Sequence, residues 1–126
     1  MINTYTIVGV TAGTTYLVKV RSLNIYGYGA FSSDFSIKAS AVPSTVSTVT
    51  TTTIASNIEI AWTAPHDGNE AIDAYQVLIY LPSTATFVED LTYCDGSNLV
   101  VLGALKCDIP ISYLVSTYSF NIGDVV

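Results

Sequence analysis

The chain contains little charge, and positive charge is especially scarce. Only 11% of its 126 residues are charged, and four basic residues stand against ten acidic ones, so the net charge is −6. Such a chain repels phosphate backbones and anionic lipid surfaces. We therefore expect no nucleic-acid partner.

Long apolar segments are also missing. The longest apolar run is Leu99–Leu105, which has seven residues and contains Gly103, whereas a membrane-spanning helix needs about 20. We therefore expect no membrane insertion. The stretch Met1–Thr4 has neither the basic region nor the apolar region of a secretory signal, so an exported protein would be seen here as a mature or internal segment.

The chain has a single histidine and two cysteines, which limits the catalytic and metal-binding sites that it could form. His66 and Asp67, with Glu70 and Asp73 nearby, form the one cluster of interest. It has no positioned nucleophile and lacks the alternate-ligand spacing of a calcium loop, so we interpret it as a solvated loop. The sequence therefore predicts a protein that is not an enzyme, with no catalytic residue, no metal ligand and no cofactor.

Cys94 and Cys107 lie 13 positions apart, with Asp95-Gly96 directly after the first. This spacing and composition are typical of a hairpin clipped across its two arms, and we expect a disulfide in an exported protein. The alternative is a pair of buried free thiols in an intracellular domain.

The residues that are present favour β-structure. Half are apolar, and β-branched and aromatic residues alternate with polar ones in short runs broken by Gly, Pro, Asn, Asp and Ser. We expect almost no helix and an all-β, antiparallel sandwich. The expected strands are Tyr5–Val10, Tyr16–Ser22, Asp34–Ala39, Asn57–Trp62, Ile72–Leu81, Phe87–Tyr93 and Ile109–Leu114.

The stretch Ala41–Ser44 marks a junction, because it contains Pro43 and because Ser and Thr dominate after it. The tract Thr45–Thr53 suits an edge strand by its β-branched content, and a mucin-like tract by its hydroxyls. The candidate O-glycosylation sites in this tract are Ser44, Thr45, Ser47, Thr48, Thr50, Thr51, Thr52 and Thr53.

Two sets of residues resemble the fibronectin type III family. Trp62, Pro65 and Tyr75 are similar to its second-strand Trp, the Pro that follows, and its third-strand Tyr. The run from Gly13 to Asn24, with the Gly-rich loop after it, resembles the family's sixth strand. The resemblance implies an immunoglobulin-like sandwich with Tyr16, Val18, Val20, Trp62, Pro65 and Tyr75 as core and fold markers. It also implies that the Tyr16 hydroxyl bonds to upstream backbone.

A narrower resemblance is to the repeats of large surface proteins of ciliates and other protists, which carry a Cys-clipped hairpin. It rests on Phe87, Glu89, Tyr93–Ser97, Cys107–Ser112 and Gly123-Asp124. It implies an extracellular or cell-surface location.

The order of the matching pieces is unusual. Residues 1–41 match the fifth to seventh strands of one fibronectin type III-like domain, and residues 42–126 match the first to fifth strands of the next. Neither sandwich is complete, so apolar faces would stay open without further strands. The missing strands would come from neighbouring repeats of a longer tandem array, from the chain itself as a permuted domain, or from another subunit joined head to tail.

We therefore expect a structural repeat unit of an extracellular array or filament, with itself or neighbouring repeats as partners. The alternative is an adhesion or carbohydrate-binding module, in which Tyr26, Tyr28 and Phe31 would stack on glycans. A third hypothesis is an accessory domain of a secreted enzyme.

Overall fold

The computed structural model describes residues 4–121, and the predicted marker pair Gly123-Asp124 lies outside them. The chain forms two compact units, which are described separately. The first comprises Met1–Pro43 and His66–Ala71, and the second comprises Ser44–Pro65 and Ile72–Val126. The segment His66–Ala71 joins the first unit through backbone pairing, because the Ala41 N–H donates to the Gly68 carbonyl at 2.9 Å.

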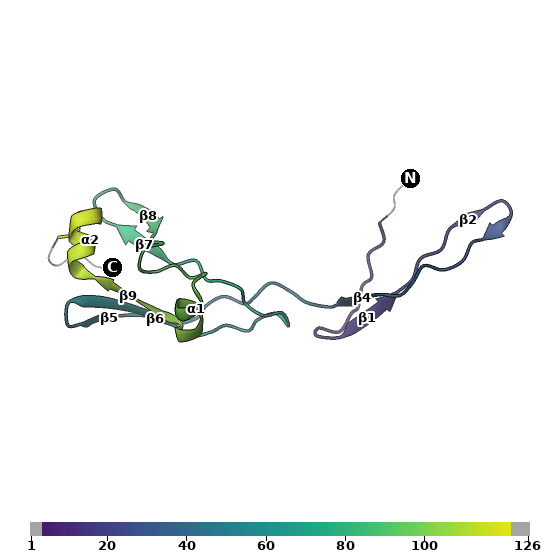
Figure 1. Cartoon of the computed structure of the whole chain (residues 1–126), viewed down its shortest axis with the longest axis horizontal. Helices are drawn as coiled ribbons and strands as arrows, with labels where there is room; N and C mark the ends of the chain where they lie inside the picture. The colour runs from purple at the N-terminus through teal and green to yellow at the C-terminus, as the bar shows by residue number, and fades with distance from the viewer. Residues whose placement is uncertain (1–3, 122–126) are drawn as a thin grey trace. The chain divides into compact units, whose positions relative to one another are not determined.

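The first unit is a long antiparallel hairpin, which we call the ribbon and define as residues 15–38 (Figure 1). Its tip is a two-residue turn at Ile25 and Tyr26, where the Asn24 Oδ1 accepts a 2.8 Å hydrogen bond from the Tyr26 N–H. β1 pairs with β4, and β2 pairs with β3. The strands are β1 (Thr15–Val18), β2 (Leu23–Asn24), β3 (Gly27–Tyr28) and β4 (Phe35–Lys38).

Alternation gives the ribbon one apolar face. Tyr16 lies opposite Ile37, and Val18 lies opposite Phe35. Leu17 and Ser36, which form the pair between them, point to the other face. None of residues 4–43 is buried. The ribbon is therefore held by its backbone ladder and cross-strand pairs, with no core of its own.

Two strand predictions in this unit are wrong in detail. Tyr5–Val10 forms no strand, because no other segment within residues 4–121 pairs with it. β1 ends at Val18, short of the expected Ser22. Beyond it the ladder becomes irregular, since the Val20 N–H bonds to the Ser32 Oγ at 3.1 Å while the Ser32 N–H bonds to the Val20 carbonyl at 2.8 Å.

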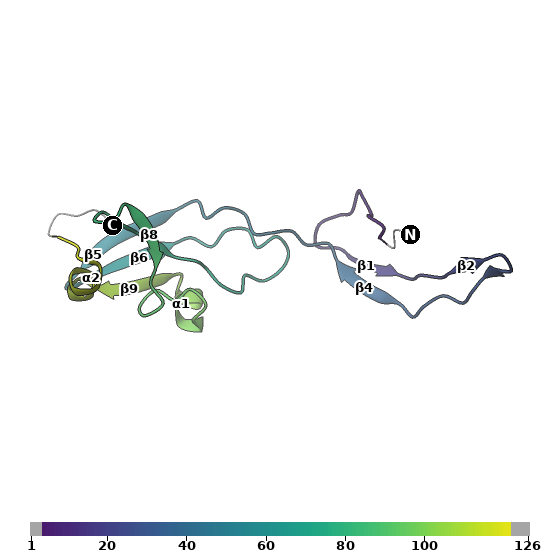
Figure 2. The same cartoon turned by 90° about the horizontal axis from the view of Figure 1, so that it is seen from above.

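The second unit contains a three-stranded antiparallel sheet, ordered β5-β6-β9, and a separate hairpin of β7 and β8 (Figures 1 and 2). Two short helices complete it. The strands are β5 (Val49–Ile54), β6 (Asn57–Trp62), β7 (Leu78–Leu81), β8 (Thr86–Glu89) and β9 (Lys106–Pro110), and the helices are α1 (Leu99–Ala104) and α2 (Ile111–Tyr118). Antiparallel strands thus dominate the regular structure, as the sequence predicts for an all-β chain.

The core of this unit lies between the sheet and the hairpin. Alternation along each strand places one apolar side chain in two on the inner face, and the disulfide and α2 close the core. Removal of these side chains from water supplies the main stabilising free energy of the unit. The buried apolar residues are Ile60, Ile79, Leu81, Cys94, Cys107, Ile109, Leu114 and Phe120.

The expectation of almost no helix is corrected by α1 and α2. Ile109–Leu114 was expected to be a strand, but β9 ends at Pro110 and α2 starts at Ile111. Pro110 lacks an N–H to continue a ladder, and the helix buries Leu114 against the core and packs Tyr118 beside it, one turn further on.

Two further strands are shorter than expected. β8 ends at Glu89 instead of Tyr93, because Asp90 ends the strand in a turn, where its Oδ1 accepts the N–H of Thr92 and Tyr93. β7 covers only Leu78–Leu81 of the predicted Ile72–Leu81. Residues 72–77 have no ladder partner in the part of the chain that the structure describes.

Candidate functional site

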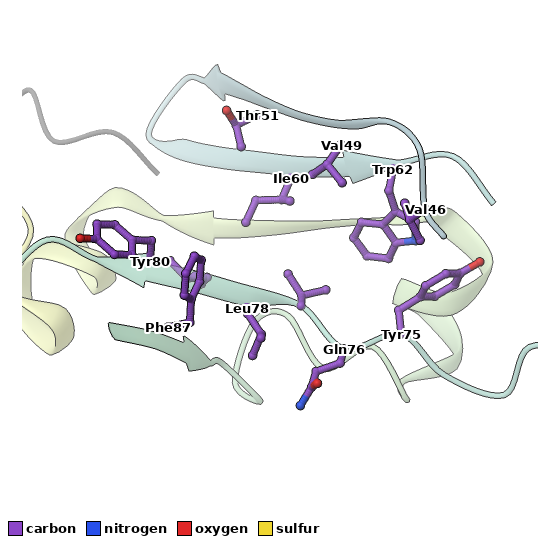
Figure 3. Close-up of a pocket in the computed structure, with 12 residues that line it drawn as sticks. Val46, Val49, Thr51, Ile60, Trp62, Tyr75, Gln76, Leu78, Tyr80 and Phe87 are labelled. Atoms are coloured by element: carbon purple, nitrogen blue, oxygen red, sulfur yellow. The ribbon is translucent and has the colours of Figure 1, made fainter. Parts of the chain in front are cut away.

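An apolar groove opens in the second unit between the β5–β6 face and the segment that leads into β7. Its volume is about 280 Å³. Val49, Ile60 and Trp62 line one wall, and Tyr75 and Val77 line the other. Figure 3 shows Trp62 and Tyr75 at one end of the groove and Tyr80 and Phe87 at the other.

Trp62 and Tyr75, two of the predicted fold markers, are brought together at this end. Their ring centroids are 5.3 Å apart, with the planes tilted by 58°, a favourable arrangement for two aromatic rings. The Trp62 Nε1 is buried and has no hydrogen-bond partner among the described residues. A buried N–H without an acceptor destabilises the fold by about 1–3 kcal/mol. Pro65, the third marker of this set, is half-buried nearby in the chain.

Backbone contacts hold Tyr75 in position. Its N–H donates to the Gly96 carbonyl at 3.1 Å. A Cβ at position 96 would lie only 2.0 Å from the Tyr75 carbonyl oxygen. Glycine is therefore required at position 96 for the two backbones to approach, and this contact sets one wall of the groove.

The other markers, Tyr16, Val18 and Val20, lie on the ribbon in the first unit. The Tyr16 hydroxyl accepts a 2.9 Å hydrogen bond from the Thr11 N–H, which is the upstream backbone contact that the fibronectin resemblance implies. That N–H lowers the pKa of Tyr16, because it stabilises the phenolate. Tyr16 and Val18 are half-buried, and Val20 is exposed.

The ribbon also has a shallow hollow on its apolar face. Tyr5, Ile7 and Val10 flank it together with Tyr16 and Val18, and its volume is about 410 Å³. Ile7 and Val10 remain 50% and 45% exposed. The N-terminal segment therefore covers the apolar face only in part.

Cys94 and Cys107 form the predicted disulfide, with Cα atoms 5.2 Å apart. Both residues are buried in the core. The expected hairpin between them is wrong, because Asn98 caps helix α1 by accepting the Val100 N–H at 2.9 Å. The bridge instead ties the loop before α1 to β9.

The serine and threonine tract divides at the start of β5. Thr50, Thr51, Thr52 and Thr53 lie on β5, an edge strand, and all four are exposed. Of these, Thr51 faces the groove. The other candidate O-glycosylation sites, Ser44, Thr45, Ser47 and Thr48, precede the strand and are also exposed.

The loop around His66 is stabilised as a turn. The His66 Nδ1 accepts the Gly68 N–H at 3.0 Å, and Asp67 Oδ1 accepts the Asn69 N–H at 2.9 Å. The His66 Nδ1 also lies 3.8 Å from the Asp67 Oδ1. No group of three or more His, Cys, Asp or Glu residues able to hold a metal ion occurs within residues 4–121.

One polar cluster was missed by the sequence analysis. Asp90 is almost completely buried and accepts hydrogen bonds from the Thr92 and Tyr93 N–H groups and from the Tyr118 hydroxyl. The spacing of Leu114 and Tyr118 is a helical signal that would have placed Tyr118 on the core side of α2. Nothing in the sequence alone connects Tyr118 to Asp90.

The chain matches no model of a known protein family, and no curated protein shows significant similarity to it. No helix within the described residues is both long and apolar enough to cross a bilayer. The fold defines a β-rich, disulfide-containing protein. Its functional role is therefore argued from the groove and the ribbon.

Proposed function

We propose that the chain is a structural repeat unit of an extracellular or cell-surface array or filament, in which neighbouring repeats or subunits complete partial fibronectin type III-like sandwiches. The role is one of assembly, without catalysis. The observation that carries it is a pair of unsatisfied surfaces, namely the ribbon without a core and the second unit with an open groove beside β7.

The order of the strands supports this proposal. In immunoglobulin-like sandwiches the first, second and fifth strands share one sheet, and the third, sixth and seventh share the other. In chain order after residue 43, β5, β6 and β9 are the first, second and fifth strands, and they form one sheet. β7, the third strand, pairs only with β8 within the described residues, so the places of a sixth and a seventh strand beside it are open.

The ribbon has the properties of such a strand pair. Phe35 and Ile37 are 69% and 54% exposed on its apolar face. An isolated two-stranded hairpin in water is only marginally stable. Burial of such side chains yields roughly 1.5–3 kcal/mol each. A partner surface that covers this face would therefore stabilise the ribbon considerably.

The disulfide supports an extracellular location. Such bridges persist in oxidising compartments and are rare in the cytosol. Cell-surface exposure is also consistent with the hydroxyl-rich, exposed strand β5.

A test of assembly needs only the full chain. Sedimentation velocity over a range of concentrations should show species that grow with concentration, and negative-stain images should show rods or filaments. A protein that remains monomeric throughout the range would contradict the proposal.

The second candidate is an adhesion or carbohydrate-binding module, and one observation favours it. Tyr26 at the ribbon tip is 91% exposed, and Arg21 lies over the Tyr28 and Phe31 rings at 3.8 and 4.5 Å. Exposed aromatic rings of this kind stack on sugars. The test is binding to a printed glycan microarray. A chain that stays monomeric, binds glycans there and loses this binding upon Tyr26→Ala substitution would favour this role over assembly.

A further inference from the structure

One edge of β7 is free in the described part of the second unit. β8 occupies one edge of β7, with Leu78 opposite Glu89. The other edge has no ladder partner among residues 4–121. An unpaired edge presents backbone N–H and C=O groups that accept another strand.

The groove lies beside this free edge. A strand added to β7 would place every second side chain toward Val49, Ile60 and Trp62, since these residues line the opposite wall (Figure 3). The buried Trp62 Nε1, which has no partner among the described residues, would gain access to an acceptor on the incoming segment. The groove is thus shaped for an extended, apolar segment.

Successive side chains of β1 point to opposite faces of the ribbon. Tyr16 and Val18 lie on its apolar face, and Lys19 follows on the other face, where it pairs with Asp34 at 3.0 Å. With the apolar face turned into the groove, the opposite face of β1 continues the outer face of β7. Glu89 lies on that outer face, opposite Leu78, and its Oε2 accepts a 3.2 Å hydrogen bond from the Gln76 Nε2. Basic residues of the ribbon would therefore lie on the same sheet face as Glu89.

Basic and acidic side chains are distributed unevenly along the chain. Residues 1–43 carry three basic side chains and one acidic side chain, a net charge of +2. Residues 44–65 and 72–126, the second unit, carry seven acidic side chains and one lysine, a net charge of −6. The remaining two acidic residues, Asp67 and Glu70, lie in the part of the first unit outside the ribbon and bring that unit as a whole to a net charge of zero. Contacts between two ribbons or between two second units bring like charges together, whereas ribbon against second unit brings opposite charges together.

We propose that the ribbon of a second copy of this chain docks on the second unit, with β1 paired to the free edge of β7 and the Tyr16–Val18 face closing the groove. This docking mode rests on the proposed function and specifies its contact. The donor and acceptor surfaces differ, so the contact is heterologous and each copy retains one free ribbon and one free groove. Such a contact propagates into a filament or closes into a ring.

Matched variants of the full chain test each surface. Phe35→Glu adds a charge to the apolar face of the ribbon, and Ser36→Glu adds it to the neighbouring position on the other face. Val49→Glu adds a charge to the groove wall, and Thr52→Glu adds it to the opposite face of β5. All four positions are exposed, so each variant should fold, and circular dichroism checks this.

Phe35→Glu and Val49→Glu should each weaken self-association at least about tenfold, because an unpaired charge would be buried at the contact. Ser36→Glu and Thr52→Glu should associate like the parent chain. An equimolar mixture of Phe35→Glu and Val49→Glu should form heterodimers and nothing larger, since the first retains only its groove and the second only its ribbon.

Trp62 gives a local readout, because it is the single tryptophan. In ¹⁵N-labelled Phe35→Glu protein, its indole N–H signal should shift when unlabelled Val49→Glu protein is added. The signal should stay unchanged when unlabelled Phe35→Glu protein is added instead.

The outcomes separate this docking mode from the proposed function. If the parent chain assembles and both groove and ribbon variants assemble equally well, or if their mixture stays monomeric, the docking mode is wrong while assembly stands. If the parent chain is monomeric at every concentration, the proposed function is rejected together with the docking mode.

Discussion

The Tyr118 hydroxyl donates a 2.7 Å hydrogen bond to Oδ2 of Asp90, a carboxylate that is only 1% exposed. Asp90 lies directly after β8 and Tyr118 lies at the end of α2, so the bond ties the helix to the hairpin beside the core. Tyr113 packs edge-on against Tyr118, with ring centroids 5.9 Å apart. Burial alone would raise the pKa of Asp90, but the hydrogen bonds that it accepts from the Tyr93 N–H, the Tyr118 hydroxyl and the Thr92 N–H together lower it.

Tyr118→Phe should destabilise the second unit by about 1–2 kcal/mol, because a hydrogen bond to a buried charge is lost while the ring remains. The free energy of unfolding from urea titration measures this. Tyr26→Phe is the matched control, because Tyr26 is 91% exposed and its hydroxyl lies in water. Equal stability of Tyr118→Phe and the parent chain would show that the bond contributes nothing.

Stability should depend on pH through Asp90. Its pKa in the folded chain is lowered, so its contribution is fully present above the pKa of the unfolded chain, about 3.9. The contribution is lost as pH falls from there through the lower pKa of the folded chain. Asp90→Asn should therefore flatten the acid limb of a plot of unfolding free energy against pH. An unchanged slope in Asp90→Asn would mean that other carboxylates, such as Asp95, whose pKa is also lowered, chiefly by the Ser97 hydroxyl, carry the dependence.

Gly96→Ala should destabilise the second unit by about 2 kcal/mol or more, since the new Cβ would lie 2.0 Å from the Tyr75 carbonyl oxygen and the backbones must separate. Gly103→Ala is the matched control, because no atom lies within 4 Å of a Cβ there. Within α1 that change should stabilise by up to about 1 kcal/mol. Thermal or urea unfolding distinguishes the two, and a neutral Gly96→Ala would refute the close approach.

Reduction of the Cys94–Cys107 disulfide should lower the free energy of unfolding by about 3 kcal/mol, as expected for a bridge that closes a loop of this length. Urea unfolding with and without a thiol reductant measures the difference. The reductant should leave a Cys94→Ala/Cys107→Ala double variant unaffected. An equal response in that variant would assign the loss to something other than the bridge.

Tyr16→Phe should speed hydrogen exchange at the Thr11 amide by about fivefold, because this N–H loses its acceptor and an interaction of roughly 1 kcal/mol. Exchange at the Ala39 amide, which bonds to the Thr14 carbonyl at 2.9 Å, serves as the internal reference. Equal protection of the Thr11 amide in both proteins would contradict the hydrogen bond.

Local patterns predicted the parts of the fold that depend on alternation. Ile58, Ile60 and Trp62 share the inner face of β6, as the period of two requires, and the two cysteines pair. The helices were missed because their apolar residues also suit a strand over so short a run. Only the place of Pro110 and the burial of Leu114 decide in favour of α2.

The sequence by itself determined that the chain is β-rich and which side chains alternate toward an apolar face, because both follow from spacing along a strand. Tertiary structure alone decided that Gly96 lies against Tyr75, that Tyr118 reaches Asp90, and that residues 72–77 remain without a ladder partner within the described chain. These are contacts between segments that lie far apart in the sequence. The pattern of neighbouring residues does not show which of the distant groups will be in contact. The physical reason is that backbone hydrogen bonds and buried polar groups are satisfied in three dimensions, by whichever segment packing brings within reach.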